Sequence, residues 1–411
     1  MKKSTIKNRI ISFVLLFAMV VGMTTTLSKK ADAAGGWKVT LKYYNGEVFK
    51  TYYNCPTNST LKLPAPAKSF SGATFVGWKS GSSVYSTGTI ITIKSNMELV
   101  GVWSFYASFT YNGTMLARLQ QKTGYKYNLP SNPTKSGYVF VNWTDSNGRA
   151  ISSSTIVTDI SRNSFKANFR ITPDKACQVI DGVLKGAYDP AGIMKDTNVN
   201  YRIAPSKNDS NYGYVRQCDR PGKDENGNEI HVGLCPYCAF TNLLNRRSVL
   251  DRGKCAFLFE DHILTKMYPA ADKSDGTFGR SKNGNYYRYL TAGKTKNGSQ
   301  LNENEESQIT FTGNGVSYTL VMTKTNGISR STLKSLIDQH PEGVVIYSGG
   351  HAAVVTAYTN SVFYCIDTGS HTGERYSSKG QTLDAVFISD KYGSNKEANV
   401  LANTIRYWYV K

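Results

Sequence analysis

Two cysteines stand three positions apart in the segment VGLCPYCAFTNLLNRR, as Cys235 and Cys238. Pro236 suits the first position of a helix, because no backbone N–H is needed there. Apolar residues then recur at helical spacing and predict an inward-facing stripe of Phe240, Leu243 and Leu244. Cys235 is therefore expected at the N-cap, where the helix dipole and free N–H groups favour a thiolate. This is the setting of a cysteine nucleophile, with Cys238 one turn further in.

Metal binding and redox chemistry are the alternatives for this pair. Structural zinc usually takes two Cys-x-x-Cys or Cys/His pairs, and the sequence contains only one. Cys218, Cys255 and His231 could complete a ligand set, but their spacings follow no zinc-finger pattern. A thioredoxin-like site lacks the surrounding βαβ pattern. We therefore assign no metal and no cofactor.

The chain has seven cysteines, an odd number, which outside the membrane leaves at least one free thiol. Cys238 can pair with Cys218 or Cys255, serve as the nucleophile in place of Cys235, or pack in the core. The disulfide pairing stays open among five cysteines: Cys177, Cys218, Cys238, Cys255 and Cys365.

A cysteine nucleophile needs a base, and the base needs an orienting group. The segment HPEGVVIYSGGHAAVVTAYTNSVFYCIDTG predicts three strands, at Val344–Tyr347, His351–Tyr358 and Val362–Ile366. His351 opens the second strand directly after two glycines, which let a substrate backbone come close. His351 is therefore the candidate base, with a buried structural histidine as the alternative.

The strand register tests whether an acid can reach His351. With residues 359–361 as the hairpin loop, Tyr358 pairs with Val362, and Asp367 falls opposite Ala353. Ala353 shares a face with His351, and diagonal neighbours on one face are within reach of each other. Asp367 is therefore the candidate orienting group.

The other four histidines have weaker settings. His340 ends a predicted helix and complements the charge at its C-terminus. His231, His262 and His371 lie in polar loops or beside acids, without a strand partner.

Together, these two segments resemble the papain-like cysteine peptidases of the bacteriocin-processing type. In that family a Gly-x-Cys opens the helix, and His-Ala-Val-x-x-Thr-x-Tyr precedes an Asp. The resemblance covers most of residues 210–370 and implies an α+β peptidase domain with Cys235 as nucleophile, His351 as general base and acid, and Asp367 as orienter. The family often supplies a Gln shortly upstream of the cysteine for the oxyanion hole. Gln217 is the nearby candidate but lies further upstream than usual, and backbone N–H groups at the helix start could serve alone.

Residues 37–172 contain an internal repeat. Phe75 and Trp78 correspond to Phe140 and Trp143, and Trp103 corresponds to Phe169. Alternating apolar residues and Gly/Asn/Ser turns predict short strands. The two copies resemble internalin-type surface repeats with a β-grasp-like fold, which act as spacers or adhesive stalks. We expect their aromatics in the core rather than at a sugar site.

The N-terminus has the features of a secretory signal. Basic residues precede an apolar run that is too short to span a bilayer, and Ala31-Asp32-Ala33 follows as a cleavage pattern. We predict that residues 1–33 are removed, that no segment spans the membrane, and that the protein is secreted and associates with a cell surface. The chain has 49 Lys+Arg against 29 Asp+Glu. This charge suits anionic cell-wall polymers or a host surface, and without a nucleic-acid motif it does not indicate nucleic acid.

The sequence thus predicts a multidomain bacterial protein. Its parts are a signal peptide (1–33), β-repeat 1 (37–104), β-repeat 2 (107–172) and a papain-like α+β domain (175–411). The predicted function is a secreted cysteine peptidase that hydrolyses peptide bonds in a peptide or protein substrate through a Cys235 thioester. Two alternatives stay open: a peptidoglycan crosslink endopeptidase or amidase, and a non-enzymatic adhesin with a peptidase-like domain.

Overall fold

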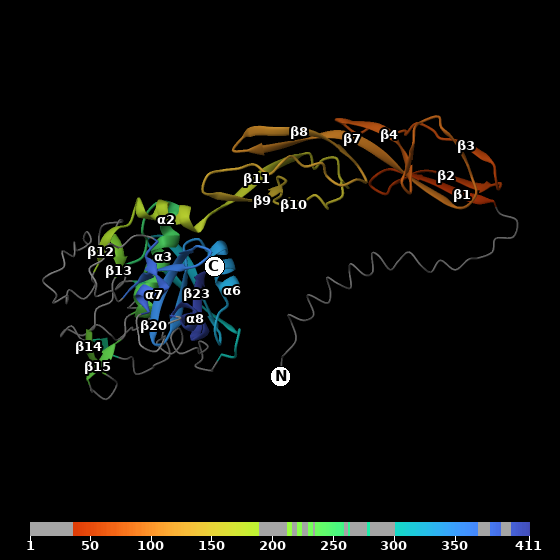
Figure 1. Cartoon of the computed structure of the whole chain (residues 1–411). Helices are drawn as coiled ribbons and strands as arrows, with labels where there is room; N and C mark the ends of the chain where they lie inside the picture. The colour runs from red at the N-terminus through yellow and green to blue at the C-terminus, as the bar shows by residue number, and fades with distance from the viewer. Residues whose placement is uncertain are drawn as a thin grey trace. The chain divides into compact units, whose positions relative to one another are not determined.

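The computed structural model describes ten stretches of the chain: residues 36–188, 212–215, 220–223, 229–232, 235–258, 262–263, 278–279, 301–368, 379–387 and 396–411. These residues form several β-rich sheets and few helices (Figure 1). They divide into two compact units. One holds the described residues up to Asn132 together with Asn142–Asn168, and the other holds Pro133–Val141 and the described residues from Phe169 onward.

The predicted signal peptide lies outside the described residues. Among the helices that are described, none combines the length and the hydrophobicity that a membrane crossing requires.

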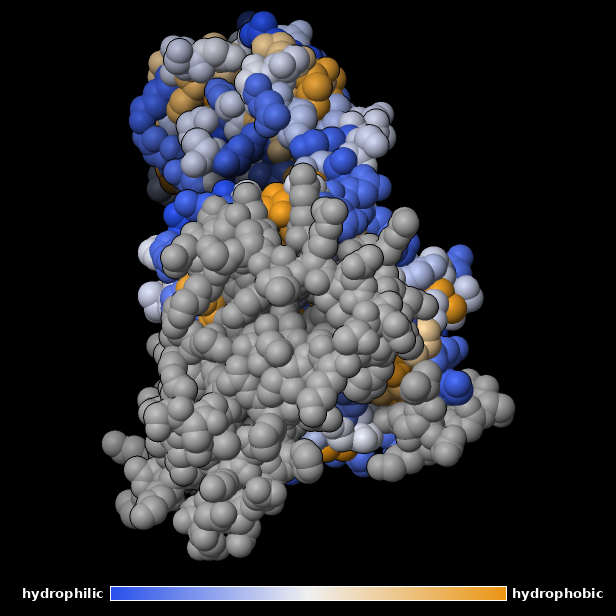
Figure 2. Space-filling model, turned by 90° about the vertical axis from the view of Figure 1, so that its left-hand side faces the viewer, coloured by the Kyte–Doolittle hydropathy of each residue, from blue (hydrophilic) through white to orange (hydrophobic). Residues whose placement is uncertain are grey.

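The repeat region is built on a nine-stranded sheet, with the strand order β10-β9-β11-β7-β1-β2 and with β4, β5 and β8 attached beside this path, and on a separate two-stranded sheet of β3 and β6. Its described residues from 36 to 172 contain no helix. The face of the repeats that Figure 2 shows is mostly hydrophilic. The strands are β1 (Trp37–Lys42), β2 (Val48–Cys55), β3 (Thr60–Lys62), β4 (Ala73–Ser80), β5 (Ser83–Tyr85), β6 (Ile90–Thr92), β7 (Met97–Tyr111), β8 (Thr114–Lys122), β9 (Tyr138–Thr144), β10 (Ala150–Ile151) and β11 (Ser164–Ile171).

The long strand β7 belongs to both repeats. Its first half lies parallel to β1, where Leu41 pairs with Leu99. Its second half lies parallel to β11, where Phe109 pairs with Phe165. The β1–β2 hairpin of the first repeat thus corresponds to the β7–β8 hairpin of the second. The last strand of one repeat is therefore the first strand of the next, and β7 runs through the boundary that the sequence suggested between residues 104 and 107.

The tryptophans of the repeats lie in the core, as predicted, whereas Phe75, Phe140 and Phe169 are half-buried. Trp78, Trp103 and Trp143 are each at most 1% exposed. Trp78 stacks on Phe49 with ring centroids 5.5 Å apart, and Trp143 meets Phe109 edge-on at 5.1 Å. Aromatic pairs in such geometries add to the stability that burial already provides.

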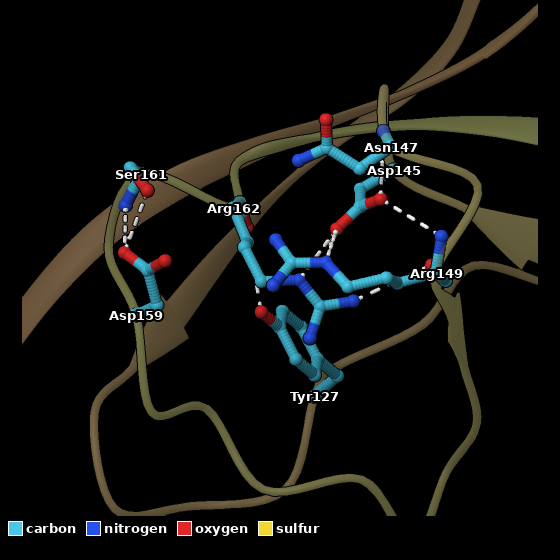
Figure 3. A network of polar contacts seen from close by, with 7 residues as sticks. All are labelled: Tyr127, Asp145, Asn147, Arg149, Asp159, Ser161 and Arg162. Atoms are coloured by element: carbon cyan, nitrogen blue, oxygen red, sulfur yellow. Dashed lines mark hydrogen bonds and ion pairs between the residues drawn. The ribbon is translucent and has the colours of Figure 1, made fainter.

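A buried carboxylate organises the second repeat, and the sequence reasoning missed it (Figure 3). Asp145 accepts hydrogen bonds from the main-chain N–H groups of Asn147 and Arg149, at 3.0 and 2.9 Å. It also accepts from the side chains of Arg149 and Arg162, at 2.9 and 2.7 Å. Burial alone would raise the pKa of Asp145, but these hydrogen bonds, first that of the Arg149 main chain, lower the pKa to about 2. The signal was present as Asp-Ser-Asn-Gly, because an Asp before Asn-Gly is typical of a turn that its own side chain closes.

The second unit is built around an antiparallel seven-stranded sheet of order β17-β18-β23-β19-β20-β21-β22. Two small sheets, β12-β13 and β15-β14-β16, accompany it. The strands are β12 (Lys185–Tyr188), β13 (Tyr212–Val215), β14 (Arg220–Lys223), β15 (Glu229–Val232), β16 (Phe278–Gly279), β17 (Glu306–Gly313), β18 (Val316–Lys324), β19 (Val344–Ser348), β20 (His351–Tyr358), β21 (Phe363–Asp367), β22 (Gln381–Thr382) and β23 (Thr404–Val410). The helices are α2 (Pro173–Asp181), α3 (Cys235–Arg252), α6 (Arg330–Gln339), α7 (Leu383–Val386) and α8 (Lys396–Ala402).

Helices cover both faces of this sheet. α3 packs against β19, β20 and β23, and its apolar residues share a core with Ala352 and Val354 of β20. Residues of α6, α7 and α8 share the opposite core with Ala353 and Val355. Because side chains alternate along a strand, neighbouring residues of β20 face different helices. This alternation decides which side chains can meet near His351.

Candidate active site

Cys235 is the first residue of α3 and is 5% exposed. The expected one-sided stripe was wrong in extent: Phe240, Leu243 and Leu244 are fully buried, but α3 is buried on almost every side. Polar residues that would normally face solvent are inside because the rest of the fold supplies their partners. Asn242 forms two hydrogen bonds with the main chain of Val215, at 2.8 and 2.9 Å.

Further along α3, two more buried polar residues fix the helix. Asn245 donates to the Phe257 carbonyl at 2.9 Å. Arg246 donates from Nε to the Glu342 carbonyl and from Nη2 to the Cys177 Sγ, the latter at 3.5 Å. These anchors hold α3 rigidly in the unit, and with it the position of Cys235.

His351 opens β20 directly after a two-residue turn. Gly349 and Gly350 have φ values of 56° and 92°, and Ser348 pairs with His351 across the turn. A two-residue hairpin with positive φ at both central positions favours glycine there. The two glycines are thus explained by the turn itself, and they bring the Gly350 carbonyl to 3.9 Å from the Cys235 Sγ.

Strands β20 and β21 pair with the predicted register at Asp367 but with a different register near the hairpin loop. Tyr358 pairs with Phe363 instead of Val362, so the predicted hairpin loop was wrong by one residue. A β-bulge at Thr356 then shifts the register back, and Asp367 pairs with Ala353 as predicted.

His351 and Asp367 are in direct contact. The His351 Nε2 lies 2.8 Å from the Asp367 Oδ1, and the Cys235 side chain is hydrogen-bonded to the same imidazole. Burial alone would lower the pKa of His351. The hydrogen bonds to Asp367 and Cys235 outweigh this effect and raise the pKa to about 10. The imidazole is therefore protonated at neutral pH and lies between a carboxylate and a thiol.

The structure thus brings together Cys235, His351 and Asp367, while the fourth predicted residue, Gln217, lies outside the described residues. Cys238 is fully buried and belongs to the core around α3. Cys235 is the cysteine that meets His351, which favours it over Cys238 as the reacting group.

Cys55, Cys235 and Cys365 are free thiols. Cys218 lies outside the described residues. Within the described part of the chain, no group of three or more His, Cys, Asp or Glu side chains could hold a metal ion.

Two of the other histidines, His340 and His262, have partners of their own. His340 caps the end of α6, as predicted, and its ring packs on Tyr409 at 4.4 Å. His262 accepts a hydrogen bond at Nδ1 from the Leu258 main chain. His231 was expected in a loop, but it lies in β15 and pairs with Pro221. His371 lies outside the described residues.

Thr368 is a site residue that the sequence reasoning missed. It follows Asp367 directly and is fully buried. Its hydroxyl lies 3.4 Å from the Cys235 carbonyl and 3.3 Å from the Ala352 carbonyl. The alternation of the strand was the available signal, because the residue after Asp367 must face the opposite side of the sheet, where α3 packs.

Comparison with protein families gives one match. Residues 105–163 match the Listeria-Bacteroides repeat domain, which covers most of the second repeat. Repeats of this kind are typical of surface or extracellular proteins. This bears out a surface repeat in this part of the chain. Comparison with curated proteins finds no match.

Proposed function

We propose that the unit from Phe169 onward is a papain-like cysteine peptidase domain that hydrolyses peptide bonds. One observation supports this proposal most strongly. The imidazole of His351 is hydrogen-bonded both to Asp367 and to a cysteine at the start of a helix. A nucleophile, its proton partner and an orienting acid in mutual contact are the parts that covalent acyl transfer requires.

The raised pKa of His351 suggests how the proton moves. Near neutral pH the imidazole is protonated. The proposed reaction starts from the pair of this imidazolium and the Cys235 thiolate, whose sulfur attacks the scissile carbonyl. Backbone N–H groups at the start of α3 stabilise the oxyanion. His351 then protonates the leaving amine, and a thioester to Cys235 remains.

In the second half of the reaction, the neutral imidazole takes a proton from water. The resulting hydroxide attacks the thioester and releases the acid, and the thiolate–imidazolium pair re-forms. Asp367 keeps the ring oriented through both steps.

The positive charge of the chain suggests a surface location. Its distribution indicates that the repeats are the part that binds the surface. Residues 36–172 hold 15 Lys and Arg against 4 Asp and Glu, whereas residues 173–411 hold 28 against 24. The four repeat carboxylates are already engaged: Glu47 with Lys68, Glu98 with Lys42, Asp145 with two arginines, and Asp159 with Ser161. The repeats therefore retain a positive charge that internal pairs do not cancel.

Much of this charge shares one face of the sheet. The core face of β7 carries Leu99 and Phe109. By strand register, and for Lys38 by alternation along β1, the opposite face carries six cations: Lys38, Lys42, Lys79, Arg118, Lys122 and Lys166. The same face carries one carboxylate, Glu98, which pairs with Lys42. We propose that the chain is exported through residues 1–33 and that this face attaches it to anionic wall polymers. Wall peptide crosslinks are then the second candidate substrate.

Salt-dependent binding tests the attachment. A triple variant with Gln at Lys38, Lys122 and Lys166 should sediment less with purified anionic wall polymer, most clearly at low salt. The matched control replaces Lys254, Lys334 and Lys411 in the other unit and should bind normally. Equal loss in both variants, or binding that salt does not weaken, contradicts the assignment.

The peptidase proposal is tested by incubating the chain with denatured protein, peptide libraries and purified peptidoglycan, beside Cys235→Ala. Cleavage of peptides by the wild type alone supports the peptidase. Cleavage confined to peptidoglycan moves the substrate to wall crosslinks. If a folded wild-type chain cleaves none of them, the adhesin alternative is the better account.

A further inference from the structure

We infer that Thr368 is a positioning residue that keeps the nucleophile and its imidazole partner in register. The inference rests on the proposed function, because it gives Thr368 a role in the reaction of Cys235 with His351. Thr368 does not touch the reacting atoms. It acts through the main chain that carries them.

The contacts of Thr368 link three elements. It directly follows Asp367 at the end of β21. Its hydroxyl contacts the carbonyl of Cys235, the first residue of α3, at 3.4 Å. The same hydroxyl contacts the carbonyl of Ala352, the residue after His351 in β20, at 3.3 Å. A hydroxyl has a single proton to donate, so the two carbonyls share this donor. A carbonyl that moves away from the hydroxyl weakens its own hydrogen bond.

The alternation of side chains along β21 explains why Thr368 can contact both carbonyls. Cys365 shares the core of α6, α7 and α8, whereas Ile366 shares the core of α3. Asp367 therefore faces the first side and Thr368 faces the second. Two consecutive residues thus hold the two partners separately: Asp367 holds the imidazole, and Thr368 holds the start of the helix that carries the thiol.

His351 bridges the two sides because it is the first residue of its strand. Its ring is 28% exposed and reaches Cys235 past the end of β20. Such a contact depends on the distance between the helix start and the strand end. A misplacement of about 1 Å in an active site can lower the rate by about a hundredfold. The Thr368 hydroxyl spans this gap.

Thr368→Val tests the inference, because it removes the hydroxyl and keeps the shape of the side chain. The chain offers a matched control in Thr356→Val. Thr356 is also fully buried, lies on the same strand as His351, and has a hydroxyl shared by two carbonyls, those of Lys379 at 2.6 Å and Tyr364 at 3.3 Å. Unlike the Thr368 hydroxyl, the Thr356 hydroxyl does not bond to the carbonyl of Cys235 or of Ala352 in these two contacts.

Three quantities are measured for each variant: the pH dependence of Cys235 alkylation by iodoacetamide, kcat and KM, and the thermal midpoint. Thr368→Val should slow alkylation and lower kcat by about tenfold with KM unchanged. Thr368→Ser, which keeps the hydroxyl, should restore both. Thr356→Val should lower the thermal midpoint and leave the alkylation profile unchanged.

The outcomes separate the inference from the proposed function. Equal slowing in Thr368→Val and Thr356→Val means a general structural effect and overturns the inference, as does a normal alkylation profile in Thr368→Val. If Thr368→Val does not fold, Thr368→Ala should show the same loss, and its failure to do so overturns the inference. A wild-type chain in which Cys235 is not the fastest thiol removes the proposed function and the inference with it.

Discussion

Each unit of the molecule contains a carboxylate that other polar groups surround, and the two sites differ in what they leave open. In the repeats, Asp145 is 4% exposed and its hydrogen bonds come from main-chain N–H groups and two arginines of the same repeat. In the other unit, Asp367 is 15% exposed, and its partner His351 is more exposed still. The first arrangement satisfies the carboxylate completely and holds loops together. The second leaves an imidazole that contacts both a carboxylate and a thiol and whose side chain is 28% exposed.

The comparison teaches that a buried, well-paired acid is not by itself evidence of chemistry. Structural ion pairs also shift pKa values strongly. Asp367 differs from Asp145 because its partner, His351, also contacts the thiol of Cys235.

Removing either member of the thiol–imidazole pair should have the largest effect. Cys235→Ala and His351→Ala should each lower turnover by more than about a thousandfold, since one carries the covalent step and the other moves the proton. His340→Ala is the matched control and should leave turnover nearly unchanged. Turnover assays with circular dichroism on each variant check this. Near-normal turnover by a folded His351→Ala would mean that another base serves the cysteine.

Asp367→Asn should weaken turnover but leave more of it than the loss of His351, because the orienting partner holds the ring and its tautomer without reacting. The variant should also change the pH profile. His351 has a pKa raised to about 10, so the imidazolium persists above its ordinary value of 6.5 and is lost only as the pH rises through about 10.

Because Asp367 is a main contributor to that raised pKa, the Asn variant should lose activity on the alkaline side at lower pH than the wild type. Measuring kcat/KM from pH 5 to 11 checks the direction. An alkaline limb that stays in place in Asp367→Asn contradicts the assigned cause.

Asp145→Asn should affect the repeats and spare the chemistry. The pKa of Asp145 is lowered to about 2 from its ordinary 3.8, so its contribution to stability is present above pH 3.8 and disappears as the pH falls towards 2. Hydrogen exchange of residues 145–162 should show protection in the wild type that falls through this range. In Asp145→Asn the protection should be low throughout, with turnover unchanged. Exchange that is identical in the two proteins contradicts the role of Asp145.

Sequence reasoning succeeded where a short-range pattern determines the structure. Asp367 lies opposite Ala353 as predicted, because the bulge at Thr356 offsets a hairpin loop that was wrong by one residue. Pro236 predicted a helix with Cys235 as its N-cap, and α3 begins one residue earlier, at Cys235 itself. The aromatic positions of the repeats predicted a core because they recur at strand spacing. Each of these depends on residues that are close together in the sequence or that repeat.

The same reasoning failed where residues that are distant in the sequence determine the local structure. The bulge at Thr356 coincides with its bond to the Lys379 carbonyl, which is 23 residues away. The all-round burial of α3 requires the partners of Asn242 and Arg246, which lie in other elements. No local pattern could predict these contacts, because a polar residue is normally exposed unless the fold supplies its partner.

The most direct test of the central claim is to compare the reactivity of the thiols. The folded chain is treated briefly with iodoacetamide near neutral pH, and the labelled cysteine is found by mass mapping, beside His351→Ala. We expect Cys235 to react first, because it lies beside a protonated imidazole, and to react more slowly in His351→Ala. Cys365 should stay unlabelled, since burial raises its pKa well above the ordinary value. First labelling at Cys238, or a Cys235 found in a stable disulfide, would contradict the account.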